Sequence, residues 1–239
     1  MTLLILGLVI FLGVHSVSIF ADRWRNRMID SLGEGPFKGL YSLIALLGLI
    51  LIIWGYGQAR LTPELLYSPP VWLRHVSLVL LLPVFPLLFA AYLPGHIRQT
   101  LKHPMLVAVK LWALAHLLAN GMLADVLLFG GFLAWAVADR ISLKRRQPRK
   151  TPALPGTPLN DAIAVVSGLI VYGLFVVWLH MALIGVPPIQ YTSDSVKLSQ
   201  TDELLEAALW GKGLDALVNN AGLPPAPQPN EYPSTATTG

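Results

Sequence analysis

Six long apolar stretches constrain what this chain can fold into more than any other feature of the sequence. A helix needs about 20 apolar residues to cross roughly 30 Å of hydrocarbon, and each stretch reaches or nearly reaches that length. More than half of the 239 residues are apolar and only 13% are charged, a balance that soluble domains do not normally show. We therefore expect an all-α fold, a polytopic membrane bundle of six transmembrane helices. The stretches cover residues 3–20, 39–56, 76–92, 105–119, 123–138 and 162–184.

Basic residues outside these stretches predict how the helices cross the membrane. The first stretch has no basic segment before it and is followed by an arginine cluster at 23–27, which favours a retained anchor over a cleavable signal peptide. The densest basic run, at 140–150, follows the fifth stretch. Because basic loops stay in the cytoplasm, we expect a bacterial inner-membrane protein with both termini periplasmic. No aromatic residues interleave with the basic run, so the expected partner is the lipid bilayer and not nucleic acid.

The last part of the chain has a different composition. We predict one transmembrane domain over 1–190 and a separate outer-face tail over 191–239. In the tail, Thr201 can cap a short amphipathic helix over 202–218, which has acidic residues in its first turn. From Gly222 onward proline, serine, threonine and glycine dominate, so we expect disorder there.

Polar residues inside the apolar stretches are the candidates for function, because ionisable groups at membrane depth are costly. The chain contains no cysteine, which excludes disulfides and thiolate metal sites and leaves histidine and carboxylate as metal ligands. His15 lies in the first stretch, and Lys110 and His116 lie in the fourth. The alternative interpretation of His15 is a buried imidazole that bonds to a carbonyl or a serine of a neighbouring helix.

The fourth stretch carries the most regular polar pattern. Trp112, His116 and Asn120 recur every four residues and therefore share one helical face. Pro104 suits the first turn of a helix, which places His103 at the cytoplasmic end. His103 and His116 lie about 20 Å apart along the helix axis, so they cannot both bind one metal ion.

His15 and His116, in contrast, can act together. Counted from their cytoplasmic ends, both lie near the middle of the bilayer, within about 10 Å of each other in depth. Two neutral imidazoles on different helices can clamp a haem between its axial positions, with apolar side chains covering the macrocycle. Lys110 can then reach a propionate, because its long side chain can extend toward the interface. The competing interpretation is that the two membrane histidines do not meet.

Four motifs resemble those of one known family. They are Leu-Pro-Gly-His-Ile-Arg at 93–98, Lys-His-Pro at 102–104, Leu-Trp-Ala-Leu-Ala-His-Leu-Leu-Ala-Asn-Gly at 111–121, and Leu-Phe-Gly-Gly-Phe-Leu-Ala-Trp-Ala at 128–136. Together they resemble the signature of the NnrU family of integral membrane proteins. The resemblance extends over residues 1–190 and does not include the tail.

This resemblance implies two kinds of function. Bacterial NnrU proteins are associated with denitrification, in nitrite and nitric oxide metabolism. Plant and cyanobacterial relatives are 15-cis-zeta-carotene isomerases, which hold a haem b between histidines. Carried over by position, those haem ligands match His15 and His116, and His103 matches a further histidine of the motif. The isomerase branch can also use a cysteine near the second histidine, and this chain has none.

We therefore expect a membrane protein of denitrification that binds haem b, with His15 and His116 as its metal ligands. The further cofactor-binding candidates are His103, Lys110, Trp112 and Asn120. A small apolar or gaseous ligand and a redox partner are the expected partners.

Two other functions stay open at this point, and with them the question of whether the protein is an enzyme. One is a haem-dependent cis-trans isomerase of a polyene. The other is a membrane methyltransferase, because Lys-His-Pro at 102–104 partly matches the Arg-His-Pro motif of such enzymes. The paired-acid motif that those enzymes carry after the next hairpin is replaced here by the basic run at 140–150.

Overall fold

The computed structural model describes residues 1–146 and 156–189, and every regular element in these ranges is a helix. Contacts divide the chain into two units, Met1–Pro187 and Pro188–Gly239, and all of these helices belong to the first. The tail helix predicted over 202–218 and the predicted disordered end lie outside the described residues and stay predictions. The helices are α1 (Thr2–Phe20), α2 (Asp22–Leu32), α3 (Glu34–Ala59), α4 (Trp72–Leu81), α5 (Val84–Tyr92), α6 (His96–Leu101), α7 (Pro104–Ala119), α8 (Leu123–Leu143), α9 (Pro158–Leu174), a π-helical turn (Phe175–Leu179) and α10 (His180–Ile184).

Five helical segments in the described ranges are long and apolar enough to cross a membrane. They include α1, α3 and α8, together with two composite segments, Trp72–Tyr92 and Pro158–Ile184. This confirms the prediction of an all-α, multi-pass membrane bundle. The remaining predicted span corresponds to α7, whose 16 residues cover only about 24 Å. The count of six therefore depends on α7 and stays a prediction.

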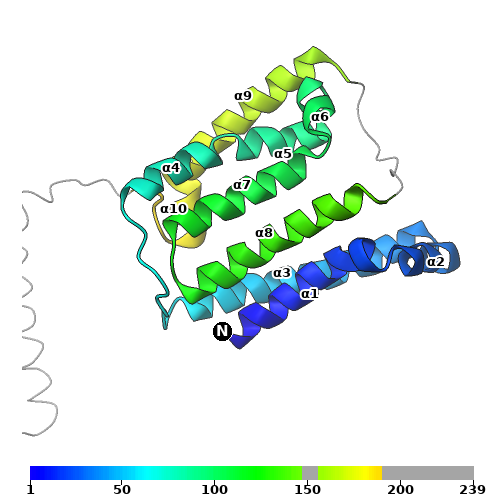
Figure 1. Cartoon of the computed structure of the whole chain (residues 1–239), viewed down its shortest axis with the longest axis horizontal. Coiled ribbons are helices and arrows are strands. Elements are labelled where there is room, and N and C mark those ends of the chain that lie inside the picture. The colour runs from blue at the N-terminus through cyan, green and yellow to red at the C-terminus, as the bar shows by residue number, and fades with distance from the viewer. Residues whose placement is uncertain (147–155, 190–239) are drawn as a thin grey trace, which may run out of the picture. The chain divides into compact units, whose positions relative to one another are not determined.

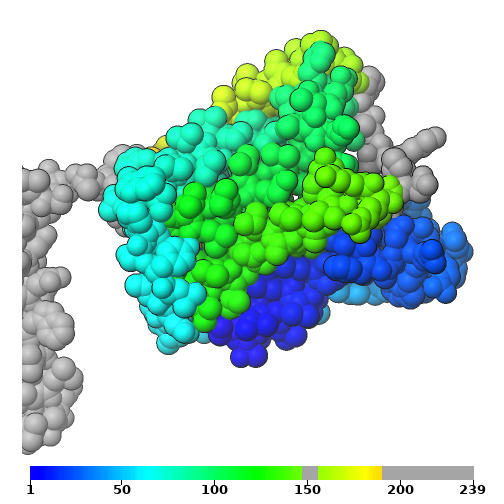
Figure 2. Space-filling model, in the orientation of Figure 1, coloured from blue at the N-terminus to red at the C-terminus, as the bar shows by residue number. Residues whose placement is uncertain are grey.

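The helices of the first unit lie side by side in an order that differs from their order along the chain. Figure 1 shows α8 between α1 and α7, with α3 packed on α1 and with α5 between α7 and α9. The space-filling view likewise shows the surface of α8 between those of α1 and α7 (Figure 2). Both helices that carry a predicted haem ligand therefore pack against the same helix, α8.

The connections between helices alternate between two ends of this bundle. At one end, the backbone N–H groups of Leu66 and Tyr67 donate to the carbonyl of Gly121, at 2.9 and 3.2 Å, and join the α3–α4 connection to the α7–α8 turn. At the other end, the Arg146 side chain donates to the carbonyl of Ser18 at 2.9 Å. The basic segments at 23–27, 98–102 and 140–146 belong to this second end. The basic segments of the sequence thus lie together at one end of the bundle.

Glycines allow α1 and α3 to approach each other closely. A Cβ on Gly48 would lie 2.7 Å from the backbone nitrogen of Phe11, and a Cβ on Gly55 would lie 2.3 Å from that of Leu4. Gly7 of α1 makes a similar approach to α3. Small residues at helix contacts are typical of membrane bundles, where close van der Waals packing replaces the hydrophobic effect as the source of association. This contact determines which face of α1 points into the bundle.

The Pro-Gly-His motif forms a junction between α6 and the start of α9. The Asp161 carboxylate accepts from the backbone N–H groups of His96 and Ile97, at 2.7 and 3.2 Å. A Cβ on Gly95 would lie 2.3 Å from an oxygen of that carboxylate, so a larger residue would have to displace the Asp161 side chain. Asn160 completes the junction by donating from Nδ2 to the carbonyl of Pro94 at 2.9 Å. Part of the family motif is therefore explained by structure, because it connects two helices far apart in the sequence.

The α1–α3 contact predicts different effects on stability when alanine replaces each of two neighbouring glycines of α3. Gly55→Ala places a methyl group against the α1 backbone and should destabilise the protein by roughly 1–3 kcal/mol. Gly57→Ala is the matched control, because a Cβ there meets nothing within 4 Å. It should leave stability unchanged or raise it by up to about 1 kcal/mol through helix propensity. Thermal unfolding of both variants in one detergent measures this. Equal effects at the two positions would contradict the close contact.

Candidate functional site

His15 faces the junction of α1, α3 and α8. Its ring stacks on Phe11 with centroids 4.2 Å apart, and it meets Tyr41 of α3 at 5.3 Å and Trp135 of α8 at 5.9 Å, both edge to face. Its Nδ1 lies 2.7 Å from the backbone carbonyl oxygen of Phe11, one helical turn earlier. The imidazole is thus held on three sides by aromatic rings and oriented by its own helix.

His116 of α7 occupies a similar environment beside α8. Its ring stacks on Phe129 of α8 with centroids 4.4 Å apart, and it meets Trp112 of its own helix at 5.4 Å. Its Nδ1 lies 2.8 Å from the backbone carbonyl oxygen of Trp112, again one turn earlier. The local arrangement of His15 is therefore repeated at His116.

The shared hydrogen bond determines the tautomer of both imidazoles. A backbone carbonyl can only accept, so Nδ1 must carry the proton in His15 and in His116. The lone pair is then on Nε2, and no described residue donates a hydrogen bond to that atom in either ring. Metal-bound histidines typically donate their other ring N–H to a carbonyl in this way, which orients the ring and raises the basicity of the ligand nitrogen. In its neutral form each ring therefore offers Nε2 as a nitrogen ligand.

A run of aromatic rings connects the two imidazoles across α8. Phe132 of α8 lies 5.6 Å from Phe11, which stacks on His15, and 5.4 Å from Trp112, which contacts His116. The sequence predicted Trp112 as a site residue but not Phe129 and Phe132, although the ring of Phe129 contacts that of Trp112. Their three-residue spacing in the Phe-Gly-Gly-Phe segment was the available signal, because it places two rings on one helical face. Within the described ranges no three histidine, aspartate or glutamate side chains converge, so the site offers two imidazoles.

This site lies within a segment that matches a known family. The sequence model of the NnrU protein family matches residues 3–188, which include every helix from α1 to α10. The chain belongs to the NnrU family. No curated protein and no solved structure matches it.

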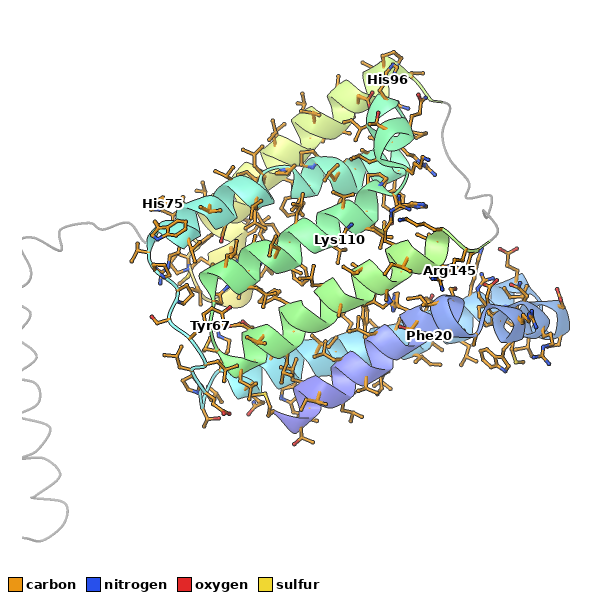
Figure 3. All side chains as sticks on the ribbon, viewed as in Figure 1. Phe20, Tyr67, His75, His96, Lys110 and Arg145 are labelled. Atoms are coloured by element: carbon orange, nitrogen blue, oxygen red, sulfur yellow. The ribbon has the colours of Figure 1, made fainter. Side chains whose placement is uncertain are left out.

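The other predicted residues of this NnrU protein have different surroundings. Asn120 is the C-cap of α7 and donates from Nδ2 to the carbonyl of His116 at 3.0 Å. Lys110 lies midway along α7 (Figure 3). It is two residues from Trp112 and therefore points to a different side of the helix. Its ammonium makes no hydrogen bond or ion pair with the described residues.

His103 lies at the basic end of the NnrU protein and is separated from the imidazole pair. It immediately precedes α7, as its N-cap, after Lys102, which has a positive φ of 61°. Burial and the neighbouring charge of Arg140 lower the pKa of His103, so the ring is neutral at pH 7. The Lys-His-Pro motif therefore forms the corner from which α7 starts.

The opposite end of the NnrU protein holds a buried carboxylate near the start of α8. Asp125 of α8 is fully buried, and it accepts from the Tyr56 hydroxyl at 2.6 Å and from the Met122 backbone at 3.3 Å. Beside it, the Tyr67 hydroxyl donates to the carbonyls of Leu117 and Asn120 at the end of α7. Burial raises the pKa of Tyr67, which keeps this hydroxyl protonated as a donor. The Tyr67 bonds tie the last turn of α7, which carries His116, to the α3–α4 connection, and the Tyr56–Asp125 bond ties α3 to the start of α8.

Removing the Tyr56 hydroxyl tests this anchoring. Tyr56→Phe keeps the ring but leaves the buried Asp125 carboxylate without its side-chain donor, which should cost about 1–3 kcal/mol of unfolding free energy. Tyr92→Phe is the matched control, because Tyr92 is 68% exposed and should tolerate the change. Chemical or thermal unfolding in detergent measures the difference between the two variants. If both unfold alike, the Tyr56–Asp125 bond does not stabilise the bundle.

Proposed function

We propose that this NnrU protein binds haem b within the membrane through His15 and His116 and acts in nitrite and nitric oxide metabolism. The observation that carries the proposal is the shared state of the two imidazoles. Each donates from Nδ1 to a carbonyl of its own helix and keeps Nε2 available, and each lies among aromatic rings on the core side of α8. Family membership supports the assignment to nitrogen-oxide metabolism.

The donor chemistry of the two imidazoles and the apolar rings beside them support the choice of this cofactor. Two neutral imidazoles on different helices are an established pair of axial haem ligands, and apolar rings suit the faces of a macrocycle. The ring of Phe132 contacts Phe11 and Trp112, which are the aromatic neighbours of His15 and His116. When bound, the haem supplies an iron that can change oxidation state.

In this proposal the chain's own residues have three tasks. The carbonyls of Phe11 and Trp112 orient the imidazoles and increase their basicity. The aromatic rings exclude water, so electrostatic effects around the iron act in a medium of low dielectric constant. The bonds of Asn120 and Tyr67 prevent the end of α7 from fraying and hold His116 in place.

The same proposal includes the location and the partners. The protein lies in a bacterial inner membrane with both termini periplasmic, because the basic end of the bundle is retained in the cytoplasm. A gaseous ligand such as nitric oxide reaches the site through the apolar interior. A redox partner supplies or accepts the electron that the iron exchanges.

Optical spectra of detergent-purified protein test the haem assignment. The oxidised and reduced protein should show the Soret and visible bands of a low-spin haem b. His15→Ala and His116→Ala should each remove one axial ligand and lower haem retention by roughly tenfold or more. His75→Ala is the matched control, since His75 is exposed at the start of α4 (Figure 3) and should leave the spectrum unchanged. Protein that shows no Soret band after growth with added haem would overturn the proposal.

A further inference from the structure

A buried hydrogen-bond donor without an acceptor lies next to His15. The Nε1 of Trp135 is inaccessible to solvent and has no hydrogen-bond partner among the described residues. Its ring stands perpendicular to the imidazole of His15, with an interplanar angle of 88°. Tryptophans near the ends of membrane helices usually have an indole N–H that water or lipid headgroups satisfy. In the structure this N–H is inaccessible to solvent, so that explanation does not hold for Trp135.

A second such donor lies at the cytoplasmic end of the same helix. The Arg146 side chain is only 12% exposed; one terminal nitrogen donates to the carbonyl of Ser18 and the other forms an ion pair with Asp139. Its Nε is buried and has no partner among the described residues. Two buried N–H groups without a partner are unusual, because native structures satisfy nearly all such groups.

The two donors belong to one seam between α1 and α8. Trp135 and Asp139 are four residues apart on α8, and His15 and Ser18 are three residues apart on α1, so each pair occupies one helical face. Arg146 bridges Asp139 and Ser18 across the seam. The two donors therefore lie along the part of the seam that starts at His15 and extends about one helical turn toward the basic end of the bundle.

The chemistry of this stretch selects an acceptor with negative charge. Trp Nε1–H and Arg Nε–H can donate but cannot accept. Asp139 offsets the charge of Arg146, but Lys102 and Arg140 also act on this end of the bundle, as their effect on His103 shows. These positive charges outnumber the one negative charge of Asp139. A carboxylate therefore suits both the two N–H donors and the positive charge around them.

We propose that Trp135 and Arg146 bind a propionate carboxylate of the haem that His15 ligates. This inference rests on the proposed function and adds the residues that orient the cofactor. The propionates are the only charged groups at the edge of haem b, and the basic end of the seam is where a charged group in the membrane is stabilised. Trp135 and Arg146 are positioning residues that set which edge of the macrocycle faces the cytoplasmic end.

Comparison of haem with its dimethyl ester tests the inference, because the ester keeps the iron and removes the carboxylates. The full-length apoprotein, purified in detergent from haem-deficient cells, is titrated with each compound and followed by the Soret band. Trp135→Phe should weaken haem binding about tenfold, since a hydrogen bond to a charged group is lost, and leave ester binding unchanged. Arg146→Gln should show the same selectivity.

The controls separate this effect from a loss of folding. Trp135→Phe leaves no protein acceptor unpaired, so the melting temperature of the apoprotein should fall only by the small amount that the smaller ring costs. Trp178→Phe and Arg145→Gln are matched changes at exposed positions and should affect neither titration. Arg145 lies at the end of α8, beside Arg146 (Figure 3).

Two results would overturn the inference in distinguishable ways. If Trp135→Phe leaves haem binding unchanged, or weakens haem and ester binding equally, the carboxylate contact is wrong while the haem site stands. If the unaltered protein binds neither compound, the proposed function fails and the inference fails with it.

Discussion

The packing of α1 and α7 on the two sides of α8 is the constraint on which the rest of the structure depends. His15 and His116 are far apart in the sequence, but their helices both pack on α8. His15 contacts Trp135 of α8, and His116 contacts Phe129 of α8. The glycines of α3 orient α1, and the Tyr56–Asp125 bond anchors the start of α8. Because hydrocarbon supplies no water, each polar group in this region must find its partner inside the protein. That requirement explains why both imidazoles bond to a carbonyl of their own helix.

Much of the fold was predictable because it follows from local properties of the chain. Apolar stretches of spanning length predict membrane helices, and the basic segments predict which connections share one end. The four-residue spacing of Trp112 and His116 predicts that they share a helical face, and their rings are in contact. Length alone was insufficient for α7, which is shorter than the other spans, so the total of six remains a prediction.

What the sequence could not reveal depends on contacts between distant residues. Asp125 resembles an ordinary helix-start carboxylate until Tyr56, 69 residues earlier, is found to bond to it. Gly95 belongs to a recognisable motif, but the reason for glycine is the carboxylate of Asp161. Trp135 lies near the end of an apolar stretch, where tryptophans often face the membrane interface. Only the structure shows that it packs against His15 and that its N–H is buried. In each case the local pattern fits several surroundings, and tertiary packing selects one.

The family assignment narrows the function without specifying a reaction. Polyene isomerisation and methyl transfer stay predictions from motifs, and no described contact favours either over haem binding. Lys102, with its positive φ, and His103 form the corner before α7, which gives the Lys-His-Pro motif a structural role.

The central claim is that His15 and His116 both ligate one iron. Electron paramagnetic resonance of the ferric protein tests it most directly, because the spin state reports the axial ligands. We expect a low-spin ferric signal in protein that retains its haem. A predominantly high-spin signal would show that one of the two imidazoles does not bind the iron, and would contradict the claim.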